Sequence, residues 1–313
     1  MKKFIKVALV LVGCVSLFLL YVQLSYRQKF EAPVVTGIKA STDSAVIAHG
    51  RYLVYSAAHC YTCHMPDSLI LQKQTEHMIG GHVFETPFAT FYTPNLTPDT
   101  VTGIGGYTDE QLARAIRYSI NHDGGAMVPF MTYNAMSDHD LTAIISYLRS
   151  TTPVSNEVPP HNANMVGKIL MRFVIKPPVV VPENIAADTT VEYGRYLAYN
   201  VANCRGCHTN RGATGEFVGD PFAGGYRWDV GTATFTSPNL TPHDTTGWIY
   251  AWSEKDFINR FKRGKTFPES PMPWEAFSTM SENDIKAIYR FLRALPPSSN
   301  KVERTYAVKE TEL

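Results

Sequence analysis

Apolar residues recur along this 313-residue chain mainly at the spacing of an α-helix. Two segments carry an apolar stripe at positions i, i+3, i+4 and i+7: Leu141, Ile144, Ile145 and Leu148, and again Ile285, Ile288, Tyr289 and Leu292. A serine precedes each segment (Ser137 and Ser281), with Asp140 and Asp284 three residues further on. This pattern predicts a helix after each serine, with an arrangement similar to a capping box.

Two more helices are predicted in each half of the chain. One begins after Thr108 in the first half and after Ser253 in the second, and another leads into Cys60 and Cys204. Residues 80–104 and 224–248 are rich in Gly, Pro and Thr, which predicts long loops. Because no stretch alternates apolar and polar residues for long, the chain is predicted to be mainly α, with no sheet.

The sequence repeats itself at a constant offset of 144 residues. The stretch GRYL at 50–53 returns at 194–197, PNLTP at 94–98 returns at 238–242, and Cys60 returns as Cys204. Such a period is far too long for a solenoid repeat and indicates a duplicated domain. We therefore predict two tandem domains of one fold, at residues 42–152 and 188–297.

The first 30 residues look like a membrane anchor. Lys2, Lys3 and Lys6 precede an uncharged run at 7–22, and no small-residue cleavage site is evident after it. Cationic residues before the run predict an uncleaved helix with the rest of the chain on the periplasmic side of a bacterial cytoplasmic membrane. The alternative is a lipoprotein box at 11–14, in which Cys14 would carry the lipid; both interpretations keep the protein at the membrane.

A proline-rich segment at 153–187 joins the two copies. Its apolar centre, 169–175, could contact a membrane, but we favour packing along the seam between the domains. The tail at 298–313 is polar and is expected to be loose.

Charge and cysteine content narrow the chemistry. The chain has 29 Lys and Arg against 28 Asp and Glu, a formal net charge of +1, so there is no electrostatic case for nucleic-acid binding. Four of the five cysteines stand in two short motifs, CYTCH at 60–64 and CRGCH at 204–208.

Three chemistries can use two cysteines separated by two residues. A redox dithiol needs no adjacent histidine. A zinc site would need the two pairs to meet across a domain boundary to supply four ligands. Covalent haem uses every residue: Cys60, Cys63, Cys204 and Cys207 form thioethers, and the histidine that follows each pair, His64 or His208, ligates iron. We therefore predict two covalently bound haem c groups.

A sixth iron ligand should come from the loop before the last helix of each copy. In the second copy Met272 lies between two prolines, whereas Met280 is expected to be core. In the first copy we favour Met131 over Met127, which requires a loop three residues shorter. Methionine is the usual soft axial ligand of an electron-transfer cytochrome.

With these motifs the chain resembles a dihaem cytochrome c, two class I-type domains in tandem, and is similar to the cytochrome subunits of membrane-bound alcohol, gluconate and related sugar dehydrogenases. Those subunits commonly carry three haems, and this chain has two motifs. The resemblance implies that a glycine of the first helix packs on an aromatic residue of the last, here Gly50 with Tyr147 and Gly194 with Phe291. It also implies that a proline carbonyl orients each proximal histidine, which by position is Pro94 for the first copy and Pro238 for the second.

These features predict an electron carrier rather than an enzyme. It would take electrons from a redox protein, such as a dehydrogenase on the periplasmic side, and pass them to a respiratory acceptor. The alternative is a dihaem enzyme, either peroxidase-like or similar to thiosulfate dehydrogenase. The latter resemblance would require a cysteine ligand, for which this chain has no spare cysteine outside its N-terminal segment.

Overall fold

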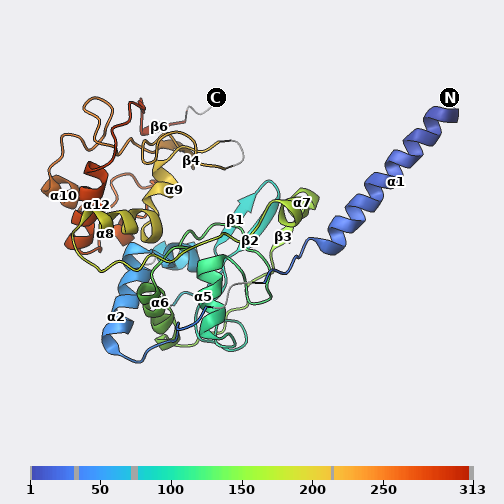
Figure 1. The fold of residues 1–313 in the computed structure, drawn as a ribbon, viewed down its shortest axis with the longest axis horizontal. Helices are drawn as coiled ribbons and strands as arrows, with labels where there is room; N and C mark the ends of the chain where they lie inside the picture. Colours follow the sequence, from blue (N-terminus) through green and yellow to red (C-terminus); the bar gives the residue numbers. More distant parts are fainter. Residues whose placement is uncertain (1, 32–34, 72–76, 213–214, 310–313) are drawn as a thin grey trace. The chain divides into compact units, whose positions relative to one another are not determined.

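The computed structural model describes residues 2–31, 35–71, 77–212 and 215–309. Their contacts form two compact units: Met1–Thr42, Cys63–Asn134 and Ile145–Val181 in the first, and Asp43–Thr62, Ala135–Ile144 and Pro182–Leu313 in the second. The lead-in helix of the first sequence copy is therefore grouped with the second unit. Figure 1 shows the path of the chain through both units.

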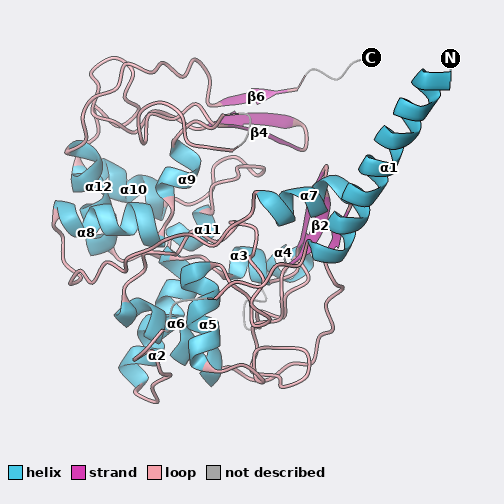
Figure 2. Cartoon of the chain, turned by 45° about the vertical axis from the view of Figure 1, so that its right-hand side comes forward, coloured by secondary structure: helices cyan, strands magenta, loops and turns pink. Residues whose placement is uncertain are grey.

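Helices are the main regular secondary structure of the described residues, and loops join them (Figure 2). Those of the first unit are α1 (Lys2–Ser25), α4 (Asp67–Leu71), α5 (Asp109–Tyr118) and α7 (Met165–Phe173). Those of the second are α2 (Ser44–Tyr52), α8 (Val191–Tyr196), α9 (Cys204–His208), α10 (Glu254–Lys262), α11 (Trp274–Phe277) and α12 (Glu282–Arg293), with π-helical turns η1 (Leu53–Ala57) and η2 (Leu197–Val201). Helices α3 (Tyr61–His64) and α6 (Asp138–Ser150) each have residues in both units.

The helix starts follow the sequence prediction. Thr108 and Ser253 cap α5 and α10 in complete capping boxes, closed by Gln111 and Asp256. Ser281 caps α12 by accepting a hydrogen bond from the Asp284 backbone at 3.1 Å. These caps satisfy N–H groups that a helix leaves unpaired at its first turn.

Two small antiparallel sheets correct the prediction that no sheet is present. Strands β1 (Val83–Thr86), β2 (Ala89–Tyr92) and β3 (Asn162–Ala163) form one, with Val83 opposite Tyr92 and Ala89 opposite Ala163. Strands β4 (Arg227–Val230), β5 (Ala233–Thr236) and β6 (Tyr306–Val308) form the other. The strands have two to four residues, too few to alternate visibly in the sequence.

The tail and the linker are more ordered than predicted. Strand β6 pairs with β5, and Ser298 is buried and accepts a hydrogen bond from Asn239 at 2.8 Å, so the part of the tail that the structure describes, residues 298–309, is not loose. In the linker, the apolar centre forms α7, which packs against α1 and β3 within the first unit. The packing that we favoured for this segment, along a domain seam, is therefore replaced by packing on the N-terminal helix.

Within the second unit, the two last helices receive tyrosines from the opposite sequence copy. Tyr196 donates to Asp140 at 2.6 Å and accepts from the backbone of Ser137 at 2.9 Å. Tyr52 makes the equivalent bonds to Asp284 and Ser281. The predicted capping boxes at Ser137 and Ser281 are thus only half formed, because a tyrosine occupies the place that a side chain from within the helix would take.

Candidate haem sites

The second CxxCH motif forms the short helix α9, and two residues separate this helix from the end of the π-helical turn η2. Residues three and four apart on a helix share a face, so Cys204, Cys207 and His208 are brought to one side of α9. All three side chains line one cavity of about 310 Å³. The sequence prediction that these residues act together is consistent with this placement.

Met272 lines the same cavity, from the Pro-Met-Pro segment that precedes α11. The remaining walls are mostly aromatic and aliphatic: Trp228, Phe235, Leu240, Trp248, Ile249, Trp252, Phe257, Phe261, Phe267, Phe277, Ile288 and Leu292. Such a lining suits a flat apolar macrocycle whose metal takes an imidazole and a thioether ligand. Met280, in contrast, is fully buried away from solvent as core, as predicted.

The hydrogen bond of His208 fixes which ring nitrogen can bind a metal. Its Nδ1 lies 3.2 Å from the backbone oxygen of Pro238, as the resemblance implied. A carbonyl can only accept, so Nδ1 carries the proton and Nε2 keeps its lone pair. Burial lowers the pKa of His208 to about 4, against the opposing effect of that hydrogen bond. The imidazole is therefore neutral at pH 7 and able to ligate.

The Cys204 thiol argues against a redox dithiol. Burial raises its pKa to about 12, and the neighbouring Cys207 adds to the shift. Redox dithiols depend on an accessible thiolate and have lowered pKa values. A neutral thiol in an apolar wall instead suits a sulfur that is consumed in a thioether bond.

The first motif repeats this arrangement in part. Cys63 and His64 lie on α3, and Cys60 comes directly before that helix. His64 is 8% exposed, and its Nδ1 lies 3.2 Å from the backbone oxygen of Pro94. The contact of the proximal histidine with Pro94, which the resemblance implied for the first copy, is therefore confirmed. Burial lowers the pKa of His64 to about 4. Met131 is half-buried in the loop between α5 and α6, where its role as a ligand stays a prediction.

A second histidine of this cavity was not expected there from the sequence. His59, which directly precedes Cys60, lines the cavity that holds His208 and Met272. Its ring meets the ring of Phe277 edge-on, with centroids 5.2 Å apart. The sequence assigned His59 to the surface or to packing; only tertiary contacts bring it to the cavity of the other copy.

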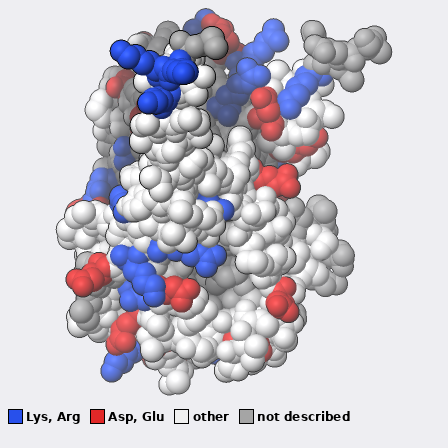
Figure 3. Space-filling view, turned by 90° about the vertical axis from the view of Figure 1, so that its right-hand side faces the viewer, with Lys and Arg blue, Asp and Glu red and all other residues white. Residues whose placement is uncertain are grey.

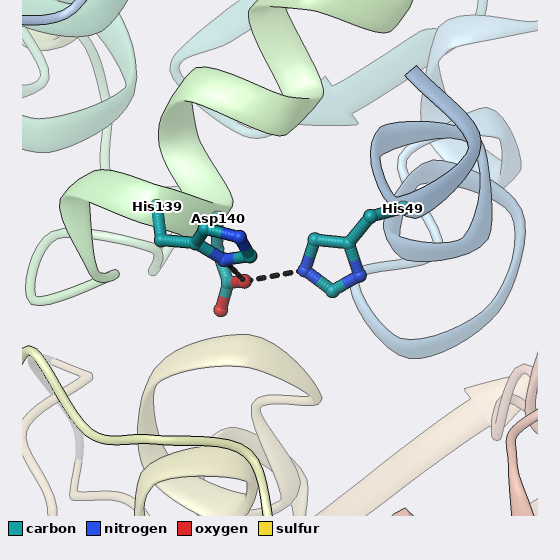
Figure 4. Close-up of side chains that lie close together, drawn as sticks. All are labelled: His49, His139 and Asp140. Carbon is teal, nitrogen blue, oxygen red and sulfur yellow. Dashed lines mark hydrogen bonds and ion pairs between the residues drawn. The ribbon is translucent and has the colours of Figure 1, made fainter. Parts of the chain in front are cut away.

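A separate cluster joins α2 to the start of α6. Figure 4 shows His49 reaching from α2 toward Asp140, with His139 beside it. The Nε2 of His49 lies 2.6 Å from Oδ1 of Asp140, and Nδ1 of His139 lies 3.4 Å from the same oxygen. Although these side chains are close enough to hold a metal ion, Tyr196 and His49 already bond both oxygens of Asp140. The cluster thus has a structural explanation within the protein.

The helix-packing glycine of the second copy is also confirmed. A Cβ placed on Gly194 would lie 1.9 Å from the backbone oxygen of Ala287 and 2.9 Å from Cβ of Phe291. Helices α8 and α12 can therefore approach only at a glycine. The equivalent pair in the first copy, Gly50 and Tyr147, stays a prediction.

Comparison with known proteins gives a family match over most of both copies. The model described as "Cytochrome C oxidase, cbb3-type, subunit III" matches residues 45–148 and again residues 192–292. The two matches follow the sequence duplication and each contains one CxxCH motif.

Several characterised relatives are cytochrome subunits of dehydrogenases. The chain is 29% identical to the fructose dehydrogenase cytochrome subunit of Gluconobacter japonicus, over 82% of this chain and 54% of that relative. It is also 29% identical to the cytochrome c subunit of the quinone alcohol dehydrogenase of Gluconobacter oxydans, over 81% of this chain and 55% of that relative. The chain spans about half the length of these relatives.

A relative of more similar length is a dihaem protein. The "Diheme cytochrome c-type" of Cereibacter sphaeroides is 25% identical, over 78% of this chain and 84% of that protein. The similarity to dihaem cytochromes and to dehydrogenase cytochrome subunits, expected from the motifs, is confirmed.

Proposed function

Because the chain belongs to the c-type cytochrome family matched over both of its copies, we propose that it is a membrane-anchored dihaem electron carrier. Cys60 and Cys63 would hold one haem c, and Cys204 and Cys207 the other. His64 and His208 would be the proximal ligands, with Met131 and Met272 on the opposite side. Bound haem supplies an iron that exchanges single electrons, while the protein contributes ligands, burial and positioning.

The second cavity carries this proposal. It gathers two thiols, a neutral imidazole with its Nε2 free, and one thioether within a single apolar lining. Apolar walls exclude water from the metal, and a methionine ligand stabilises the reduced state relative to a second histidine. Both properties suit a carrier with a high potential.

His59 supports transfer between the two sites. It lines the second cavity, and one peptide bond joins it to Cys60, the first thioether residue of the other motif. The attachment point of one haem and the wall of the other are therefore neighbours along the chain. Such a short covalent route suits a protein in which both sites exchange electrons.

The proposed donor is a dehydrogenase at the outer face of the cytoplasmic membrane, and the acceptor is a respiratory protein. The relatives named as fructose and alcohol dehydrogenase cytochrome subunits support this donor class. Helix α1 is long and apolar enough to cross a membrane, with a mean hydropathy of 2.5. We propose that it remains as the anchor and holds the carrier beside its partners.

Replacement of each methionine tests the axial ligands. In Met272→Ala and Met131→Ala, we expect one haem each to become high-spin, with a lower reduction potential, because a thioether favours ferrous iron. Met127→Ala is the matched control and should leave both haems unchanged. Optical and EPR spectra during a redox titration measure all three variants.

The three variants test the ligand of the first site and the ligand of the second site separately. If Met127→Ala perturbs a haem and Met131→Ala does not, the ligand of the first site is reassigned while the carrier function stands. If Met272→Ala leaves both spectra and both potentials unchanged, the assignment of the second site is wrong.

A further inference from the structure

Helix α7 is fastened to the end of α1 by polar contacts. The Nζ of Lys168 donates to Oε1 of Gln23 at 2.9 Å, and the Nε of Arg172 donates to Oγ of Ser25 at 3.2 Å. Figure 2 shows α7 beside the last turns of α1. These bonds place one face of a linker helix against the point where the N-terminal helix ends.

An aromatic pair extends the contact deeper along α1. The rings of Phe173 and Phe18 are stacked, with centroids 6.1 Å apart and planes 12° apart. Phe18 precedes Ser25 by seven residues, or roughly 10 Å along a helix axis. No charged residue stands between Lys6 and Arg27, so Phe18 lies within the uncharged part of α1. Because the Phe173 ring stacks on Phe18, Phe173 lies at the same level along α1.

The charge around α7 is of one sign. Residues 158–182 contain Lys168, Arg172 and Lys176, spaced by four, and no Asp or Glu. Lys176 also reaches the segment after α1, with its Nζ 3.1 Å from Oε1 of Gln28. Figure 3 shows one face of the molecule, on which groups of Lys and Arg side chains lie beside broad uncharged surface. Because the whole chain is nearly neutral, this cationic stretch is a local feature.

Apolar side chains of the same segment are left in solvent. Val174 is 61% exposed, Val179 101% and Val181 78%, beside Phe173 at 47%. A cationic stripe next to exposed apolar side chains is the composition of helices that lie in a lipid headgroup layer.

We propose that α7 and residues 174–181 form a membrane-surface element. Phe173 enters the acyl-chain boundary beside α1, and Lys168, Arg172 and Lys176 bind the phosphates of anionic phospholipids. This proposal rests on the proposed anchoring by α1. It gives the linker the task of fixing how the haem-binding domains are held at the membrane.

Nitroxide labels on the full-length haem-loaded protein test the proposal in vesicles. One label is placed on the native Cys14 in α1, and two others are placed by Phe173→Cys and Val101→Cys in a Cys14→Ser background. Val101 is 87% exposed and belongs to the same unit. We expect the labels at 14 and 173 to collide with oxygen and to be shielded from an aqueous nickel chelate, and the label at 101 to show the reverse.

The labels separate two kinds of failure. A label at 173 that meets the nickel chelate as freely as the label at 101, while Cys14 is shielded, overturns the proposal and leaves the anchor in place. A Cys14 label exposed to the chelate overturns both the anchor and the proposal.

A second experiment varies the charge of the lipids in the vesicles. Adding phosphatidylglycerol to phosphatidylcholine vesicles should increase the shielding at 173, and the triple variant Lys168→Gln, Arg172→Gln and Lys176→Gln should lose that increase. A control triple variant at exposed cations elsewhere, Lys255→Gln, Arg263→Gln and Lys301→Gln, should retain it. Equal shielding in neutral and anionic vesicles contradicts the proposed phosphate binding.

Discussion

At the residue scale, hydrogen-bond partners explain most of what the functional side chains can do. His64 and His208 each give the Nδ1 proton to a proline carbonyl and keep Nε2 for a ligand. The resemblance predicted both prolines, because they lie at fixed positions after each motif. It could not predict His59, because nothing in the sequence around CYTCH indicates a contact with the second cavity.

The tyrosines that cross between copies were also missed. Tyr52 and Tyr196 are equivalent in the repeat, as are Asp140 and Asp284. This double equivalence was a usable sign that the four residues share a role. Their pairing, however, depends on how the copies contact each other within the second unit, which residue spacing does not determine.

Asp140 makes stability depend on acid pH. Burial alone would raise the pKa of its carboxyl, but hydrogen bonds from His49 and Tyr196 outweigh that effect and hold the pKa below its ordinary value. The unfolded chain therefore binds this proton at a higher pH than the folded chain does. The stabilisation is present above the ordinary pKa of about 4 and is lost as pH falls through the folded value.

We expect Asp140→Asn to lower the free energy of unfolding near neutral pH by about 1–3 kcal/mol, through loss of charge-assisted hydrogen bonds. The difference from wild type should shrink below pH 4. Urea denaturation of the haem-loaded protein over a pH series measures it, with Asp123→Asn, whose side chain is 70% exposed, as the control. A difference that is constant from pH 7 to pH 3 would contradict the role of this carboxylate.

At the element scale, the sequence predicted helices well and strands poorly. The apolar stripes and the capping residues mark α5, α6, α10 and α12 because each helix buries one face for at least two turns. Strands of two to four residues offer no comparable period, and β3 and β6 join their sheets from the linker and the tail.

Gly194 tests the packing of α8 on α12. Gly194→Ala would push a methyl group into the backbone of Ala287, which cannot move aside as a flexible side chain could. We expect a loss of about 1–3 kcal/mol in the free energy of unfolding. In the matched control, Gly106→Ala, the nearest atom to the new Cβ would be the Thr100 backbone oxygen at 3.4 Å, and a change within about 0.5 kcal/mol is expected.

Equal effects of the two alanine variants in chemical denaturation would mean that α8 and α12 do not meet at this glycine. A large effect confined to Gly194→Ala supports the close approach.

At the scale of the whole molecule, the proposed function is that of a carrier held at a membrane. A net charge of +1 leaves no general field to attract partners, so docking depends on local patches. Both copies carry a CxxCH motif whose histidine is buried, neutral and oriented by a proline carbonyl. In the proposed carrier, each of these histidines would be one ligand of a haem iron.

The most direct test is a coulometric redox titration of the full-length protein with both haems attached, followed by optical and EPR spectroscopy. The account predicts two electrons per chain, two low-spin haems in both oxidation states, and slow reaction with cyanide and peroxide. A single electron per chain, or a five-coordinate haem that binds cyanide rapidly and consumes peroxide, would contradict it.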